Sequence, residues 1–260
     1  MPHAAGLYYE THGAEDAPPL ILSSGLGGSA SYWAPNIPAL AARHRVIAYD
    51  HRGTGRSDRA LPETTSVEEM AADLLALMDA LAIDQADVLG HALGGMIGIE
   101  MAIMTSRIRK LVIVNGWRAL SPHTRRCFDV RLNLLRDSGP AAYLHAQPLF
   151  LYPPDWIAAH DAALCEEAAH QLTSFPGADT IEKRIAAVRA YSPGLMDLTA
   201  TSDWLAIATR DDMLVPYQSA LDVAAPVPWA KTATLDWGGH ACNVTDPDRF
   251  NPIVIEFLGA

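Results

Sequence analysis

The chain has 260 residues, half of them hydrophobic, and a formal net charge of -11 at pH 7. This length suits one large domain, or one domain that carries an insertion, with a sizeable core. The negative charge argues against nucleic acid and anionic membranes as partners. Because Cys127, Cys165 and Cys242 are far apart and odd in number, we expect a reducing compartment and no disulfide framework.

The first residues, the length of the apolar runs and the spacing of the histidines further limit the kinds of protein that this chain can be. The first residues show no basic segment followed by an apolar one, and no apolar run approaches the roughly 20 residues that span a bilayer. There is no metal-ligand cluster: His3, His12, His44, His51 and His160 have no useful spacing with carboxylates or cysteines. We therefore expect a cytoplasmic protein with a small-molecule substrate, no membrane partner and no bound metal.

Short apolar strands alternate with helical patterns along the first half of the chain. This alternation predicts a mostly parallel sheet covered by helices on both faces. The predicted strands span residues 7–11 (at the sheet edge), 20–24, 46–50, a run that begins at residue 86, and 111–115. The predicted helices span residues 33–42 and 65–81, and the second has apolar residues at helical spacing and an N-cap at Thr65 or Ser66.

The alternation stops after the strand at 111–115. Residues 118–201 are mostly helical in pattern, are interrupted by prolines and contain no convincing strand. Strands at 204–208 and 232–235 and a helix at 247–258 then complete the pattern. We therefore predict a core formed by residues 1–117 and 202–260, with residues 118–201 inserted as a helical lid.

The sequence Gly90-His91-Ala92-Leu93-Gly94 joins a strand to a helix. Glycines flank a middle residue whose backbone is strained, which is the pattern of a nucleophile elbow with serine in the middle. Here the middle residue is Ala92, and a methyl group cannot attack a carbonyl. Three interpretations follow: an engineered Ser→Ala change, a hydrolase that works without a covalent step, or a non-catalytic relative. We interpret His91 as structural.

Asp212 and His240 each follow a predicted strand. Elbow, acid and base thus occur in the chain order of a Ser-Asp-His triad, at strand ends. His240 would move protons, and Asp212 would hold its tautomer and stabilise the imidazolium. Taken singly, these residues are equally typical of a capping aspartate and a buried loop histidine. Taken together with Ala92, they predict a catalytic site.

A glycine-rich turn at residues 25–28 follows the second predicted strand. The backbone N–H of Leu26, with that of Leu93, would form an oxyanion hole, which does not depend on a serine. Further residues predicted to line the substrate pocket are Gly25, Tyr32, Asn115 and Trp117, with Gln147 and Tyr152 as additional candidates.

The same turn admits a second interpretation. Gly25-x-Gly27-x-x-Ala30 fits a dinucleotide fingerprint, and Asp50 lies 20 residues past Ala30. Alone, this match would favour a nicotinamide cofactor. Because it explains neither Ala92, Asp212 nor His240, we expect no cofactor.

These residues together resemble the α/β hydrolases over the whole chain and, more narrowly, the RutD-type hydrolases of the Rut pyrimidine-utilisation pathway. The narrower resemblance rests on residues 24–28, 31–33, 90–94, 114–117, 123–128, 147–153 and 239–247. It implies an α/β-hydrolase fold with an inserted helical lid and no cofactor. In this family the elbow position is not always serine, which favours a natural Ala92.

The resemblance implies a hydrolase of carbon–nitrogen bonds late in uracil breakdown. The substrate is either carbamate, released as ammonia and carbon dioxide, or 3-aminoacrylate, converted to malonic semialdehyde and ammonia. A serine esterase inactivated at position 92 and a non-catalytic binding relative remain open alternatives. Also open are a homodimer through lid or edge-strand surfaces, and a lid arginine (Arg118, Arg125 or Arg126) that binds the substrate carboxylate.

Overall fold

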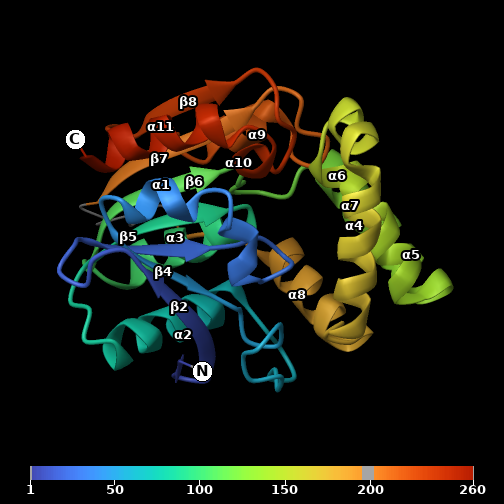
Figure 1. Ribbon diagram of the computed structural model, residues 1–260, viewed down its shortest axis with the longest axis horizontal. Coiled ribbons are helices and arrows are strands. Elements are labelled where there is room, and N and C mark those ends of the chain that lie inside the picture. The colour runs from blue at the N-terminus through green and yellow to red at the C-terminus, as the bar shows by residue number, and fades with distance from the viewer. Residues whose placement is uncertain (1, 195–201, 260) are drawn as a thin grey trace.

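The centre of the computed structural model, which describes residues 2–194 and 202–259, is an eight-stranded sheet (Figure 1). Its order is β1-β2-β4-β3-β5-β6-β7-β8, and only the pairs β1/β2 and β2/β4 are antiparallel. This confirms the predicted fold class. The strands are β1 His3–Ala4, β2 Leu7–His12, β3 Pro19–Ser23, β4 Arg45–Tyr49, β5 Ala86–His91, β6 Ile108–Val114, β7 Asp203–Thr209 and β8 Lys231–Leu235.

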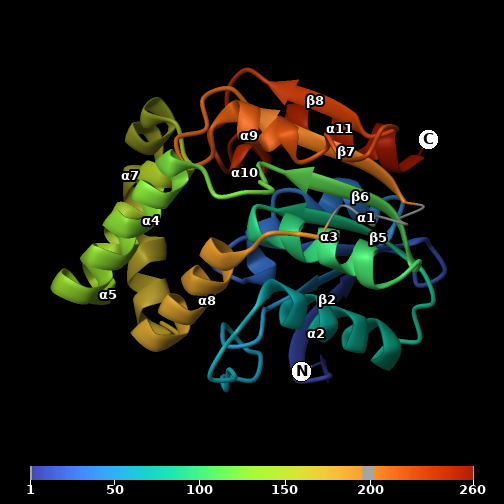
Figure 2. The same cartoon turned by 180° about the vertical axis from the view of Figure 1, so that it is seen from behind.

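Helices cover both faces of the sheet. Helices α2 (Val67–Ala80) and α3 (Leu93–Met104) lie on one face, and α1 (Ile37–Ala41) and α11 (Pro247–Gly259) lie on the other (Figures 1 and 2). Neighbouring strand residues alternate between the two cores: Ile21 packs with the α2 and α3 side, whereas Leu20 and Leu22 pack with the α1 and α11 side. The parallel strands are therefore apolar on both faces, which is why they read as continuous apolar runs.

Several element boundaries differ from those predicted. The helix expected at 33–42 is a 3₁₀ turn, η1 (Ala30–Trp33), followed by the five-residue α1. Pro35 and Pro38 supply no N–H for a continuous helix. Strand β2 is not at the edge, because β1 pairs outside it. Two short helices were not predicted: α9 (Tyr217–Asp222), between β7 and β8, and α10 (Cys242–Thr245).

The chain between β6 and β7 forms a layer of helices beside the sheet, on the right of Figure 1 and the left of Figure 2. We call α4 to α8 the lid helices: α4 Pro122–Asn133, α5 Gly139–Ala146, α6 Pro148–Leu151, α7 Pro154–Thr173 and α8 Ala178–Ala190, with a π-helical turn at Leu134–Ser138. Of the segment predicted as a lid, residues 195–201 lie outside the described part of the chain. In the described residues, no helix is long and apolar enough to cross a membrane.

The elbow between β5 and α3 has the strained backbone that its sequence predicts. Ala92 has φ 49° and ψ -110°, a conformation that costs a non-glycine residue free energy. A Cβ atom at Gly94 would overlap the carbonyl oxygen of Ser23 in β3, and one at Gly90 would overlap the carbonyl oxygen of Gly94. Close approach of these backbones therefore requires both glycines.

We expect Gly94→Ala to lower the free energy of unfolding by about 3 kcal/mol or more, because the new methyl group must displace the central strand β3. Urea denaturation measures this change. Gly27→Ala is the matched control, since a Cβ there meets no atom within 4 Å. Equal unfolding midpoints for the parent and Gly94→Ala would contradict the close approach.

Candidate active site

His240 and Asp212 meet at the carboxyl ends of β8 and β7. The Nδ1 atom of His240 lies 2.8 Å from Oδ2 of Asp212, and the two side chains are 2% and 0% exposed. The other carboxylate oxygen, Oδ1, accepts hydrogen bonds from the N–H groups of Leu214 (2.7 Å) and Val215 (2.9 Å). Because the carboxylate is fixed by the backbone and occupies Nδ1, the Nε2 atom of His240 is the one left for proton transfer.

Asn115 holds the His240 loop instead of lining the pocket, which corrects its prediction as a substrate-binding residue. It is fully buried at a positive φ of 47° just after β6. Its Nδ2 donates to the carbonyl oxygen of His240 (2.8 Å), and its Oδ1 accepts from the N–H of Thr209 (2.9 Å). The amide thus ties the ends of β6 and β7 to the loop. His91 Nε2 also contacts the His240 carbonyl oxygen, at 2.9 Å.

A cavity of about 580 Å³ lies between the strand ends and the lid helices. His240 and the strained Ala92 both lie on its wall. The Tyr32 ring stacks on His91 with centroids 5.0 Å apart, and its hydroxyl donates to Oδ1 of Asn243 (2.8 Å). The other residues predicted for the site that line this cavity are Gly25, Leu26, Leu93 and Trp117.

Leu26 and Leu93, whose backbone N–H groups are predicted to form an oxyanion hole, line the same cavity as Ala92. Leu93 is the first residue of α3, and the first N–H groups of a helix have no acceptor inside it. Leu26 lies in the turn after β3, and its carbonyl oxygen accepts from Nη2 (3.0 Å) and Nε (3.2 Å) of Arg184. Arg184, in α8, therefore ties the turn to the lid helices.

Arg184 is a residue that the sequence analysis missed. Its side chain is fully buried, and burial lowers its pKa to about 10. Besides the Leu26 carbonyl, it donates to Nδ1 of His51 at 2.9 Å. The sequence does carry a sign of this role, because Arg184 falls on the apolar stripe formed by Ile181, Ile185 and Val188. A charged side chain on a buried stripe needs buried hydrogen-bond partners.

The structure contradicts the dinucleotide interpretation. One carboxylate oxygen of Asp50 accepts from the N–H of Ala30 (2.8 Å), and the other accepts from the N–H (2.9 Å) and Nε (2.8 Å) of Arg56. Neither oxygen is left for a ribose hydroxyl. The turn after β3 also leads into the four-residue η1 and not into a long helix whose N-terminus could bind a pyrophosphate. In the described ranges, no group of three or more histidines, cysteines and acids could hold a metal.

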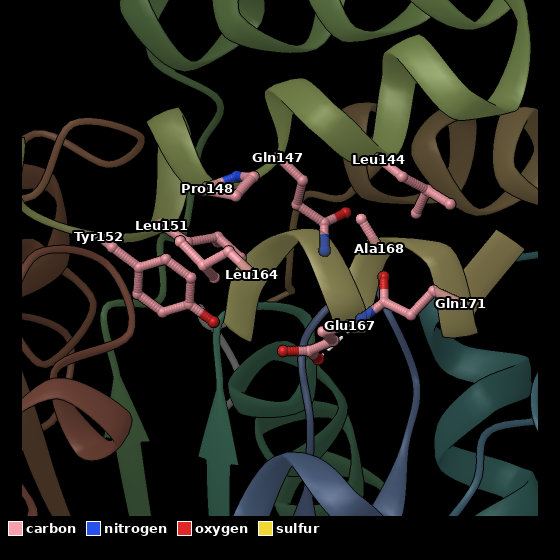
Figure 3. A pocket seen from close by; sticks show the side chains of 9 residues that line it. All are labelled: Leu144, Gln147, Pro148, Leu151, Tyr152, Leu164, Glu167, Ala168 and Gln171. Carbon is pink, nitrogen blue, oxygen red and sulfur yellow. Dashed lines mark hydrogen bonds between the residues drawn. The ribbon is translucent and has the colours of Figure 1, made fainter. Parts of the chain in front are cut away.

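Lid side chains form the far wall of the cavity. Figure 3 shows part of this wall, with Gln147 and Tyr152 facing Glu167 and Gln171 of α7, where Gln171 Nε2 donates to Glu167 Oε1 at 2.8 Å. Gln147 and Tyr152 are the two additional pocket candidates that the sequence suggests. The sequence left open that a lid arginine binds the substrate carboxylate. The three candidates, Arg118, Arg125 and Arg126, are exposed and do not line the cavity. Arg131 of α4, which was not considered, is buried and does line it.

The buried histidines His91 and His51 predict a pH-dependent stability. Burial lowers the pKa of both rings well below the usual value; the nearby His240 adds to this effect at His91, and Arg184 adds to it at His51. Below pH of about 6.5 the unfolded chain binds protons at these positions that the folded chain does not bind, so stability falls. Each histidine contributes up to about 1.4 kcal/mol per pH unit.

We therefore expect the free energy of unfolding to be about 2 kcal/mol lower at pH 5.5 than at pH 7.5. Urea denaturation at the two pH values measures the difference. His145→Gln, which changes an exposed ring, should leave the difference intact. Equal stability at both pH values would show that the folded protein accepts these protons.

Comparisons with known proteins agree with this architecture. The model of the alpha/beta hydrolase fold family matches residues 18–151. A protein of Pseudomonas savastanoi pv. phaseolicola named "Putative carbamate hydrolase RutD" is 46% identical, with 98% of this chain and 99% of that protein covered. A protein with the same name from Caulobacter sp. (strain K31) is 47% identical, with 97% and 96% covered.

Solved structures give the same result. A hydrolase from Pseudomonas aeruginosa PA01 is 28% identical with a TM-score of 0.84, covering 98% of this chain and 94% of its own. The enol-lactonase from Burkholderia xenovorans LB400 is 25% identical with a TM-score of 0.86, covering 98% and 96%. The chain therefore belongs to the α/β-hydrolase fold family and, within it, to the RutD-type hydrolases.

Proposed function

We propose that this protein hydrolyses the carbon–nitrogen bond of a small carboxylate, carbamate or 3-aminoacrylate, as a cytoplasmic step in uracil breakdown. The relatives named as carbamate hydrolases support the reaction class. The observation that carries the mechanism is a buried His240–Asp212 pair, 2.8 Å apart, in a cavity whose elbow position is Ala92. Such a site can move protons and cannot form an acyl-serine.

Both candidate reactions need proton transfer more than they need a nucleophilic side chain. The carbon of carbamate is itself the carboxylate carbon and is a poor target for attack; protonating the nitrogen lets the C–N bond break to ammonia and carbon dioxide. 3-Aminoacrylate is an enamine. A proton added to its C2 gives an iminium ion, water adds to C3, and loss of ammonia leaves malonic semialdehyde.

In this mechanism Nε2 of His240 delivers the proton to the substrate and then removes one from the attacking water. His240 is an imidazolium before the first step and after the second, and Asp212 stabilises that charged form. The N–H groups of Leu26 and Leu93 bind a negatively charged oxygen of the substrate. Ala92 leaves the place of the serine hydroxyl to a water molecule.

We also propose that residues 118–201 act as a lid over the core formed by 1–117 and 202–260. The cavity wall supports this role, because it combines strand-end residues such as His240 with Gln147 and Gln171 of the lid helices. A covering layer of this kind limits water around the substrate and strengthens the electrostatic interactions inside.

Ammonia release tests the proposal. Freshly generated carbamate and, separately, 3-aminoacrylate are mixed with purified protein or with buffer, because both substrates also decompose without an enzyme. Acceleration of one substrate assigns the reaction. Equal rates with protein and buffer for both substrates would overturn the proposed function.

A further inference from the structure

Arg131 is a buried cation on the wall of the active-site cavity. It lies on the inward face of α4 with Thr124, Cys127, Phe128 and Leu132, and it is 4% exposed. Every other member of this face is apolar or a small hydroxyl. An arginine is rarely buried this far unless it is paired.

The guanidinium group of Arg131 is only partly satisfied. Its Nη2 donates to the hydroxyl of Tyr143 (2.8 Å) and, at a longer 3.4 Å, to Oε1 of Gln147, whose side chain is visible in Figure 3. Its Nε is buried without a hydrogen-bond partner, and neither Nε nor Nη1 donates to any residue that the structure describes. Over the same part of the chain, no carboxylate forms an ion pair with Arg131.

Aromatic rings surround the charge. The Cζ atom of Arg131 lies 5.1 Å from the ring centroid of Tyr143, 5.7 Å from that of Phe150 and 5.8 Å from that of Phe128. Cation–π contacts of this kind offset part of the cost of burial. They do not replace a negative partner, and a buried charge without one is costly. The surroundings of Arg131 thus favour an anion that enters from the cavity.

Two other charged residues, Arg184 and Glu167, help to show that Arg131 lacks a negative partner. Arg184 is also fully buried, but its guanidinium donates to the carbonyl oxygens of Leu26 and Arg52 and to the His51 ring, so it is used structurally. Glu167, an acid on the cavity wall, is exposed and accepts a hydrogen bond from Gln171. It therefore does not neutralise Arg131.

We propose that Arg131 binds the carboxylate of a substrate whose acid group is separated from the reacting carbon by at least one carbon. This inference rests on the proposed function, because it takes His240 and Ala92 as the place of reaction. A planar guanidinium binds carboxylates well through two parallel hydrogen bonds. In carbamate the carboxylate carbon is itself the reacting carbon. One carbamate molecule therefore cannot place its carboxylate on Arg131 and its reacting carbon at His240 and Ala92.

The size of the cavity agrees with separate places for the carboxylate and for the reacting carbon. Cavities of about 300–1,000 Å³ accommodate ligands far larger than the four heavy atoms of carbamate, and this cavity measures about 580 Å³. With the acid group on Arg131, the N–H groups of Leu26 and Leu93 are free to bind the oxygen supplied by the added water, which gains negative charge as its proton is removed and ammonia leaves. The substrate class is therefore short enamine or amino carboxylates such as 3-aminoacrylate, and longer members of that class.

Binding of an unreactive probe tests the anchor independently of turnover. Propionate, with propionamide as its uncharged counterpart, is titrated by calorimetry into the parent and into Arg131→Met, Arg131→Lys and Arg126→Met. Arg126 is the matched control, because it is an exposed arginine on the same helix. We expect Arg131→Met to weaken propionate binding about 10- to 100-fold, Arg131→Lys to be intermediate and Arg126→Met to equal the parent.

Two results would overturn the anchor: equal affinity of propionate for the parent and Arg131→Met, or equal affinity of the parent for propionate and propionamide. If Arg131→Met does not fold, Arg131→Lys decides: undiminished propionate affinity counts against a bidentate site, and weakened affinity supports it. His240→Gln should bind propionate as the parent does. Propionate binding without any ammonia release would overturn the proposed function alone, whereas ammonia release with kcat and KM unchanged in Arg131→Met would overturn the anchor alone.

Discussion

Replacing His240 with glutamine is expected to slow ammonia release about 10²–10⁴-fold, the usual contribution of a positioned general acid–base. Glutamine approximates the size of the ring and can still form a hydrogen bond near Asp212, which lies 2.8 Å from Nδ1 in the parent. It cannot carry a proton to the substrate at neutral pH. The loss should therefore fall mainly on kcat, measured as the initial rate of ammonia release above the buffer rate.

His145→Gln is the control for this change, since His145 is an exposed histidine of α5 that does not line the cavity. It should keep the parental rate. If His240→Gln released ammonia as fast as the parent, His240 would not be the proton carrier. The His240–Asp212 pair would then have only a structural role in the loop.

Ala92→Ser is expected to create an esterase. The strained backbone of the elbow is retained at Ala92 (φ 49°, ψ -110°), which precedes Leu93 and lines the same cavity as His240. A serine hydroxyl placed there would complete a triad and attack an activated ester. With p-nitrophenyl acetate we expect a burst of about one nitrophenol per active site and a rate at least about 10²-fold above the parent.

The double variant Ala92→Ser/His240→Gln is the control and should show no burst, because the hydroxyl then lacks its base. Absence of a burst from a folded Ala92→Ser protein would mean that the elbow no longer presents a nucleophile to the cavity. Ammonia release from the physiological substrate should not rise in Ala92→Ser. A large rise would indicate that the reaction benefits from covalent catalysis.

The sequence predicts the central sheet well because its strands carry their signal locally. Buried parallel strands are apolar on both faces, so β3 to β7 stand out as continuous apolar runs. The elbow is equally local: Gly90 and Gly94 are required by contacts of the turn itself and of the adjacent strand. Ser66 and Glu69 likewise form a capping box at the start of α2, close to where the helix is predicted.

Long-range contacts explain most of what the sequence does not reveal. The helix predicted at 33–42 is divided near Asn36, whose buried amide donates to the carbonyl oxygen of Asn243 (2.9 Å) and to Oδ1 of Asn251 (2.8 Å), more than 200 residues away. The sequence predicts Asn115 as a pocket residue, but its side chain holds the His240 loop. Its hydrogen bonds to Thr209 and His240 are visible only in the folded chain.

The arginines show the same limit in the site. Arg118, Arg125 and Arg126 attract notice because they cluster near the start of the lid, yet all three are exposed. Arg131 and Arg184 lie on apolar helical stripes and are buried. Helical spacing could have identified both as inward-facing. Spacing could not have shown that one is satisfied by backbone carbonyls and the other faces a cavity.

The central claim is that this site cleaves a carbon–nitrogen bond by proton transfer, without a covalent intermediate. Its most direct test is a rapid-quench experiment in which ammonia and the intact mass of the protein are measured in the same samples during turnover. We predict ammonia release well above the buffer rate while the protein keeps its unmodified mass. A covalent adduct that forms and decays at the rate of turnover, or ammonia release no faster than in buffer, would contradict the claim.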